Sequence, residues 1–121
     1  MSDRHAFKQL AVQQLSEGGI LVRFTKRRIL SEHVIEQVRQ EMQALVAPER
    51  LMLLDLSNVE YLSSAALGIL ITTHRMLRRW TGRMTLCGIP EKIAEVFRIC
   101  KLDRLFEIYP DLESALAAQC S

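Results

Sequence analysis

The chain has 121 residues, 49% of them hydrophobic and 25% charged, which fits one folded domain spanning residues 1–121 and excludes a disordered chain. Its formal net charge of +2 excludes the basic excess typical of nucleic-acid binders, so no nucleic-acid partner is expected. No apolar run approaches the roughly 20 residues that cross a bilayer, and the first ten residues lack the apolar core of a signal peptide, so we expect a cytoplasmic protein without a membrane partner.

Hydrophobic patterning predicts a hairpin, a helix and a buried strand in the first half of the chain. Residues 7–15 are predicted as a strand, Gly18-Gly19 as a hairpin turn, and the alternation over residues 20–25 as a second strand. Apolar residues at spacings of three and four over residues 31–48 predict an amphipathic helix. The continuous apolar run at residues 51–54 predicts a central strand covered on both faces.

The second half of the chain alternates helices with strands. The predicted order is a helix that opens at Ser63-Ser64 and stops at Gly82, a strand at 83–87, a helix from Pro90, a strand at 105–109, and a short helix capped by Asp111. Helices and strands joined by short connections predict an α/β fold, with a mostly parallel central sheet, an N-terminal hairpin strand and about four helices.

Helical spacing also predicts which side of each helix is buried. Met76 and Trp80 are predicted core residues of the helix after Ser63-Ser64, and Val96 and Cys100 of the next helix. A basic set faces the other way, and it consists of Arg75, Arg78, Arg79 and Arg83. This set could dock an acidic partner, although such a run is more often a solvated helix face.

Cysteine and histidine spacing predicts neither a disulfide framework nor a metal site. Three cysteines are an odd number without CxxC spacing, and three histidines are scattered along the chain. They are Cys87, Cys100, Cys120, His5, His33 and His74. No metal and no cofactor are expected.

The pair Ser63-Ser64 stands at a predicted helix entrance beyond the carboxyl end of the central strand, where sites collect in parallel sheets. The first turn of a helix has unpaired N–H groups and partial positive charge, so it tolerates a phosphoserine. A phosphate adds a charge of about −1.5 to −2 and could switch off partner binding without refolding. The alternative is an ordinary N-cap, whose hydroxyl satisfies a backbone N–H.

Two segments resemble the STAS domain family, and more closely its single-domain anti-sigma factor antagonists, also called anti-anti-sigma factors. They are DLSNVEYLSSAALGIL and, further along, RMTLCGIPEKIAEVFRICKLDRLFEIYPDLESAL. The resemblance implies a STAS-like fold and a phosphorylated serine at Ser64. It also implies that the unphosphorylated form binds an anti-sigma factor or serine-protein kinase, that phosphorylation ends this binding, and that a serine phosphatase restores it.

By the same resemblance, other residues are candidates for the phosphosite loop and the partner surface. They are Asp55, Ser57, Tyr61, Leu62, Ser63, Ala65, Ala66, Lys26, Arg27 and Arg28. Ala66 stands where the family usually has Gly, and the basic triplet replaces a Gly-acid turn. Asp55 could instead serve only as turn chemistry, and Leu62 could pack as a hydrophobic staple.

An enzyme is not expected, and no catalytic residue is assigned. Ser64 as a nucleophile would need a base, yet His74 lies ten residues further along the helix, about 15 Å away. Leu62 and Ala66 also fail the Gly-x-Ser-x-Gly pattern. The alternative to a phosphorylation switch is a scaffold or ligand-sensing module of the same fold, in which Ser64 is never phosphorylated.

Overall fold

A five-stranded sheet forms the centre of the protein. The computed structural model describes residues 8–15, 18–29 and 31–119. The strands lie in the order β1 (Leu10–Gln14), β2 (Ile20–Phe24), β4 (Leu51–Asp55), β6 (Arg83–Cys87) and β7 (Glu107–Tyr109). β1 pairs with β2 in antiparallel fashion and every later pairing is parallel, which confirms the predicted hairpin and mostly parallel sheet.

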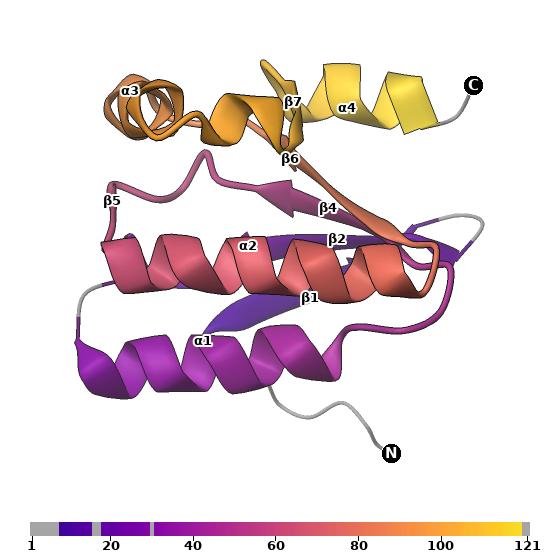
Figure 1. Cartoon of the computed structure of the whole chain (residues 1–121), viewed down its shortest axis with the longest axis horizontal. Helices are drawn as coiled ribbons and strands as arrows, with labels where there is room; N and C mark the ends of the chain where they lie inside the picture. Colours follow the sequence, from indigo (N-terminus) through magenta and orange to yellow (C-terminus); the bar gives the residue numbers. More distant parts are fainter. Residues whose placement is uncertain (1–7, 16–17, 30, 120–121) are drawn as a thin grey trace.

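Helices cover both faces of this sheet (Figure 1). They are α1 (Glu32–Ala44), α2 (Ser64–Arg79), α3 (Glu91–Ile99), α4 (Leu112–Gln119) and a short 3-10 helix, η2 (Leu102–Arg104). α1 and α2 pack side by side, while α4 lies against β6 and β7. The α/β prediction with about four helices is confirmed. Among the described residues, no helix is both long and apolar enough to span a bilayer.

The two faces of β4 build two separate parts of the core. Met52 and Leu54 belong to the larger cluster, which α1 and α2 cover, while Leu53 packs with Cys87 and Ala115 under α4. Alternating side chains point to opposite faces of a strand, and residues 52–55 are all buried. The prediction of a central strand covered on both sides is therefore confirmed.

Several predicted boundaries differ from the structure. The first strand covers Leu10–Gln14, within the predicted 7–15, whose first residue lies outside the described residues. The helix predicted over 31–48 ends at Ala44, where the chain turns toward β4. The strand predicted over 105–109 begins only at Glu107, because the Leu105 N–H bonds to the Leu102 carbonyl 3.0 Å away and prolongs the 3-10 turn.

Some predicted core residues lie on the surface. Trp80 is 53% exposed because it caps the end of α2 and leaves the helical path there. Val96 and Cys100 are also exposed, and Met76 is only partly buried. His74 takes a core place that periodicity did not assign, and its ring lies tilted by 54° against the ring of Phe106, with the ring centroids 5.0 Å apart.

The end of α2 is built differently from the predicted glycine stop. Thr81, not Gly82, adopts the left-handed conformation, at φ 60°. The Gly82 N–H bonds to the Leu77 carbonyl at 2.8 Å, which closes the helix in a Schellman arrangement. Gly82 is needed for another reason, because a Cβ atom there would collide with the backbone of Arg50.

Candidate functional site

The two serines at the start of α2 have different structural roles. Ser63 is the N-cap, with extended backbone angles, and its Oγ accepts a hydrogen bond from the Ala66 N–H at 3.2 Å. Ser64 is the first helical residue and is exposed, and no hydrogen bond of its hydroxyl is found among the described residues. The capping role therefore falls to Ser63, which leaves the Ser64 hydroxyl accessible at the positive end of a helix.

A small two-stranded sheet brings the basic loop against this helix entrance. β3 (Arg28–Ile29) pairs in parallel with β5 (Tyr61–Leu62). The Arg27 carbonyl accepts from the N–H groups of Glu60 at 2.6 Å and Tyr61 at 3.2 Å. Segments more than 30 positions apart in the sequence thus form one surface next to the start of α2. This surface contains Lys26, Arg27 and Arg28 together with the segment that leads into the two serines.

The charges of this surface partly compensate one another. Nη1 of Arg27 lies 3.5 Å from Glu60, and Nη1 of Arg28 lies 4.0 Å from the same carboxylate. All three side chains are more than half exposed, so these ion pairs contribute little to stability. Lys26 is exposed, and no ion pair of its amine is found in the described part of the chain.

An apolar groove of about 210 Å³ lies beside the start of α2. Its apolar lining comes from Tyr61, Leu62, Leu67, Ile93 and Val96. Tyr61 is 46% and Val96 is 40% exposed, whereas Leu62 is buried at 8%, which agrees with packing of Leu62 as part of the helix entrance. The two α3 residues were missed as site candidates because helical spacing alone assigned that face to the core.

Asp55 is buried at the end of β4 and is fully engaged. Its Oδ1 accepts from the Ser57 N–H at 3.0 Å, and its Oδ2 accepts from Nε of Arg23 at 3.0 Å. Burial by itself raises the pKa of Asp55, but the hydrogen bonds from Ser57 and Arg23 outweigh it and hold the pKa below its ordinary value of 3.8. Asp55 is therefore an ionised turn-forming residue at neutral pH.

Gly88 completes this turn from the neighbouring strand. Its φ is +67°, and a Cβ atom there would lie 2.9 Å from Oδ1 of Asp55. The Gly88 N–H bonds to the Tyr109 carbonyl at 3.3 Å. Neither Gly88 nor Arg23 was predicted as a site residue, because only the register of β2, β4 and β6 brings them to Asp55.

The predicted site residues thus fall into two groups at one edge of the sheet. Asp55 and Ser57 form the turn after β4, and no hydrogen bond joins this turn to Ser63 or Ser64 among the described residues. The remaining candidates surround the entrance of α2. Within that second group Ala65 is exposed, whereas Ala66 is buried at 2% and packs into the core.

Besides Asp55, the described part of the chain buries two titratable side chains, His74 and Cys87. The described residues contain no cluster of three His, Cys, Asp or Glu side chains that could hold a metal ion. His74 is buried, and its Nδ1 accepts from the Met84 N–H at 3.4 Å. Burial and the nearby Asp55 charge raise the pKa of Cys87 to about 11, so this thiol is protonated and unreactive at neutral pH.

Comparison with known proteins gives consistent results. The family model of the STAS domain matches residues 12–115. A Bordetella bronchiseptica protein named as an anti-sigma factor antagonist, BtrV, is 34% identical over 84 residues, which cover 69% of this chain and 72% of that protein.

Solved structures show the same fold. An anti-sigma factor antagonist domain from Planctomyces limnophilus superimposes with a TM-score of 0.80 at 23% identity, covering 93% of this chain and 98% of that one. The Bacillus cell fate determinant SpoIIAA, in its phosphorylated form, superimposes with a TM-score of 0.68 at 17% identity, covering 90% and 97% of the two chains.

Proposed function

This chain belongs to the STAS domain family, and we propose that it acts as an anti-sigma factor antagonist in a partner switch controlled by phosphorylation of Ser64. In this proposal residues 1–121 work as one cytoplasmic unit. The unphosphorylated form binds an anti-sigma factor that is also a serine-protein kinase. Phosphorylation releases that partner, and a serine phosphatase restores binding.

The accessibility of Ser64 carries the proposal. Its hydroxyl is exposed at the first position of α2, while the neighbouring Ser63 is held in the cap. The N–H groups of the first helical positions have no preceding helical carbonyl to bond, so they can face a phosphate. The relative SpoIIAA has been solved in both a phosphorylated and an unphosphorylated form, which supports the view that this fold accepts a phosphate.

The groove beside Ser64 supplies a physical basis for release. Tyr61 and Val96 expose apolar surface there, which a partner would cover when it binds. A phosphate on Ser64 adds a charge of about −1.5 to −2 together with its hydration shell. Packing a partner against this surface would then require removal of that hydration at a high cost, so affinity falls although the domain stays folded.

We also propose that the chain is regulatory and has no catalytic activity of its own. Its named relatives are anti-sigma factor antagonists, which are regulatory proteins. A catalytic role for Ser64 as a nucleophile would need a neighbouring base. His74 is ten residues further along the same helix, about 15 Å away, so we do not propose it as that base. The Nδ1 atom of His74 is already occupied by the Met84 N–H.

The proposal is tested first by locating the phosphate. Tagged wild-type protein and the Ser64→Ala variant are recovered from the source cells in steady growth and under stress, and phosphopeptides are quantified by mass spectrometry. We expect phosphate on Ser64 at an occupancy that changes with condition, and no phosphate on the adjacent Ser63 in the variant. Absence of phosphate from Ser64 in every condition, with the cognate kinase expressed, would refute the proposal.

Partner capture then tests the mechanism. Ser64→Ala and Ser64→Asp baits are compared for the amount of bound anti-sigma factor. We expect the Asp variant to capture at least about tenfold less, equivalent to 1.4 kcal/mol of binding free energy. Ser114→Asp is the matched control, because it adds the same charge in the first turn of α4. Equal capture by the Ser64→Asp and Ser64→Ala baits would remove the mechanism.

A further inference from the structure

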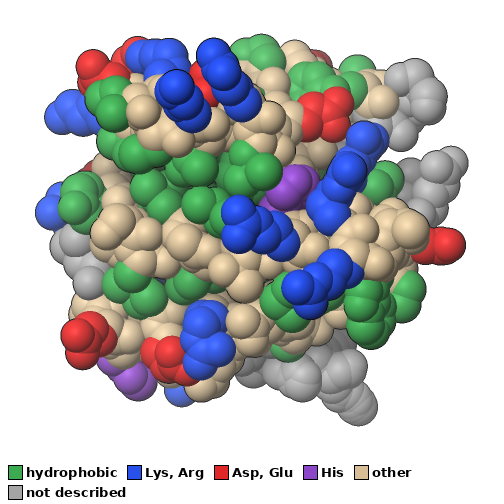
Figure 2. All heavy atoms as spheres, viewed as in Figure 1, with side chains coloured by type: hydrophobic (Ala, Val, Ile, Leu, Met, Phe, Trp, Pro, Cys, Tyr) green, Lys and Arg blue, Asp and Glu red, His purple; other side chains and the backbone are tan. Residues whose placement is uncertain are grey.

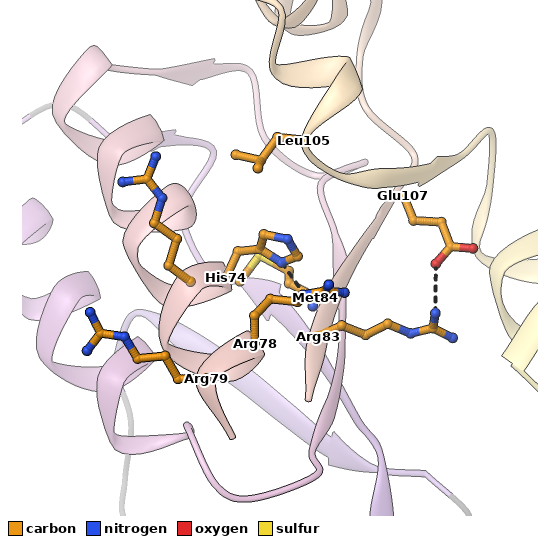
Figure 3. Close-up of a pocket in the computed structure, with 8 residues that line it drawn as sticks. His74, Arg78, Arg79, Arg83, Met84, Leu105 and Glu107 are labelled. Atoms are coloured by element: carbon orange, nitrogen blue, oxygen red, sulfur yellow. Dashed lines mark hydrogen bonds and ion pairs between the residues drawn. The ribbon is translucent and has the colours of Figure 1, made fainter. Parts of the chain in front are cut away.

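A basic cleft lies at the opposite end of α2 from Ser64. It has a volume of about 730 Å³ and is lined by Arg75, Arg78 and Arg79 of α2 and by Arg83 at the start of β6. Figure 2 shows basic side chains gathered on this face around a histidine. In Figure 3, Arg78 and Arg83 lie at the mouth of the cleft in front of Met84, with Leu105 across from them. The cleft therefore combines a cationic rim with an apolar lining.

The positive charge of this cleft is poorly balanced within the protein. Arg83 pairs with Glu107 at 3.4 Å, but no ion pair is found for the three α2 arginines among the described residues. α2 contains no Asp or Glu, whereas Arg39 pairs with Glu36 in α1 and Arg98 with Glu91 in α3. A solvated helix face normally mixes charges of both signs, so this face is unusual.

The helix dipole accounts for only part of the arrangement. Cations in the last turn of a helix interact favourably with its dipole, and this explains Arg78 and Arg79. Arg75 lies four residues before Arg79, and like charges at this spacing destabilise a helix. Arg83 comes from a different element and adds a fourth charge to the same cleft. An external anion would relieve this repulsion.

His74 adds a neutral hydrogen-bond donor to the lining. Its Nδ1 accepts from the Met84 N–H, and burial followed by the charge of Arg78 lowers its pKa below 6.5. The neutral ring must therefore carry its proton on Nε2. With Glu107 already engaged by Arg83, the lining offers mainly donors, which suits an occupant with several acceptors.

The shape of the surface favours an extended occupant. A second depression of about 460 Å³ shares Arg78 and Arg83 with the first and continues past Leu51 and the α2–β6 turn. Figure 3 also shows Arg79 extending away from the other labelled arginines, so the basic surface is wider than the cleft. A single small anion would engage only part of it, whereas an extended chain advances about 3.3 Å per residue and could follow it.

We propose that this arginine cleft binds an extended acidic segment of a partner protein through paired carboxylates on the arginines. Arginine guanidinium groups bind carboxylates in a bidentate manner, and Leu105, which is 37% exposed, accepts an apolar part of the segment. Fifteen residues of α2 separate Ser64 from Arg79, about 22 Å along the helix axis. The cleft can therefore be occupied whether or not Ser64 is phosphorylated, and it tethers a partner independently of the switch.

The test uses fluorescein-labelled hexaglutamate as probe and fluorescence anisotropy as readout. The Arg75→Gln/Arg78→Gln double variant is compared with Arg39→Gln/Arg98→Gln, which removes the same charge from other helices. We expect at least tenfold weaker binding for the first pair, less than twofold for the second, and unchanged affinity for Ser64→Asp. Circular dichroism and thermal melting verify that each variant is folded.

Two results would overturn the proposal. Equal weakening by both double variants would mean that the probe senses only net charge. Displacement of the probe by inorganic tripolyphosphate at lower concentration than by unlabelled hexaglutamate would show a small-anion site instead. Amide shifts of the 15N-labelled wild type on adding hexaglutamate give an independent measure, and they should centre on His74, Arg83 and Met84.

Discussion

Replacing Ser63 by alanine should destabilise the protein, whereas replacing Ser64 should not. The Ser63 hydroxyl accepts from the Ala66 N–H at 3.2 Å, and loss of such a cap costs about 1 kcal/mol. For a chain of 121 residues the unfolding entropy is about 0.25 kcal/mol/K, so this loss lowers Tm by about 4 °C. Ser64→Ala removes an exposed hydroxyl and should change the free energy of unfolding by less than about 0.5 kcal/mol.

Urea denaturation followed by circular dichroism measures both changes. Ser31→Ala is a positive control, because the Ser31 hydroxyl caps α1 by accepting a hydrogen bond from the Val34 N–H, also at 3.2 Å. Loss of this cap should lower the free energy of unfolding by a similar amount. An equal loss from Ser63→Ala and Ser64→Ala, or no loss from Ser63→Ala, would contradict the division of roles. The functional proposal would then lose its argument that the Ser64 hydroxyl is free for modification.

Two further predictions concern residues that the fold brings together. Gly88→Ala should lower the free energy of unfolding by at least about 2 kcal/mol. A left-handed residue other than glycine costs about 1–2 kcal/mol, and the added Cβ atom would also press against Asp55. Gly18→Ala is the control, because Gly18 also has a positive φ but an added Cβ atom there would have no neighbour within 4 Å. This variant should show only the backbone cost in the same urea assay. Equal losses of unfolding free energy in the two variants would argue against the contact with Asp55. Burial and then Arg78 lower the pKa of His74 below 6.5, so the unfolded chain binds this proton more readily and stability falls as pH drops below about 6.5. His74→Gln should reduce the difference in unfolding free energy between pH 7 and pH 5, and an unchanged difference would contradict the assignment.

Local patterns were most reliable where the physical cause was itself local. The alternation over 20–25 and the apolar run at 51–54 predicted β2 and β4 to within one residue, because side-chain direction repeats along a strand. The same reasoning misplaced Trp80, since periodicity extends a helical face beyond the point where the helix ends. It also assigned Val96 to the core, although α3 leaves that side chain open beside Tyr61.

The candidate site shows the same division. Ser64 could be proposed from the sequence, because a helix entrance after a buried strand and the surrounding motif are contiguous in the chain. Two neighbours of Asp55 could not be proposed from the sequence. Arg23 and Gly88 each lie more than 30 residues away in the chain and come close to Asp55 only through the strand register. The turn role of Asp55 was one of the two alternatives given by the sequence, and the local bond from the Ser57 N–H agrees with it. Its part in partner binding stays a prediction, as does the assignment of residues 1–121 to a single domain.

The amino-acid sequence alone specified the α/β class, the order of the five strands of the main sheet and the four longer helices, and the resemblance to STAS domains. Hydrophobic period, turn residues and motif spacing are properties of neighbouring residues, whereas the short strands β3 and β5 were not predicted. The structure was needed to separate Ser63 from Ser64 in role and to show that Arg83, already grouped with Arg75, Arg78 and Arg79 by the sequence, lines one cleft with them. Caps depend on backbone angles at one residue, and clefts depend on elements that meet across the fold. The sequence therefore predicted a serine cap without choosing between the two serines, and the cleft forms only when the chain packs.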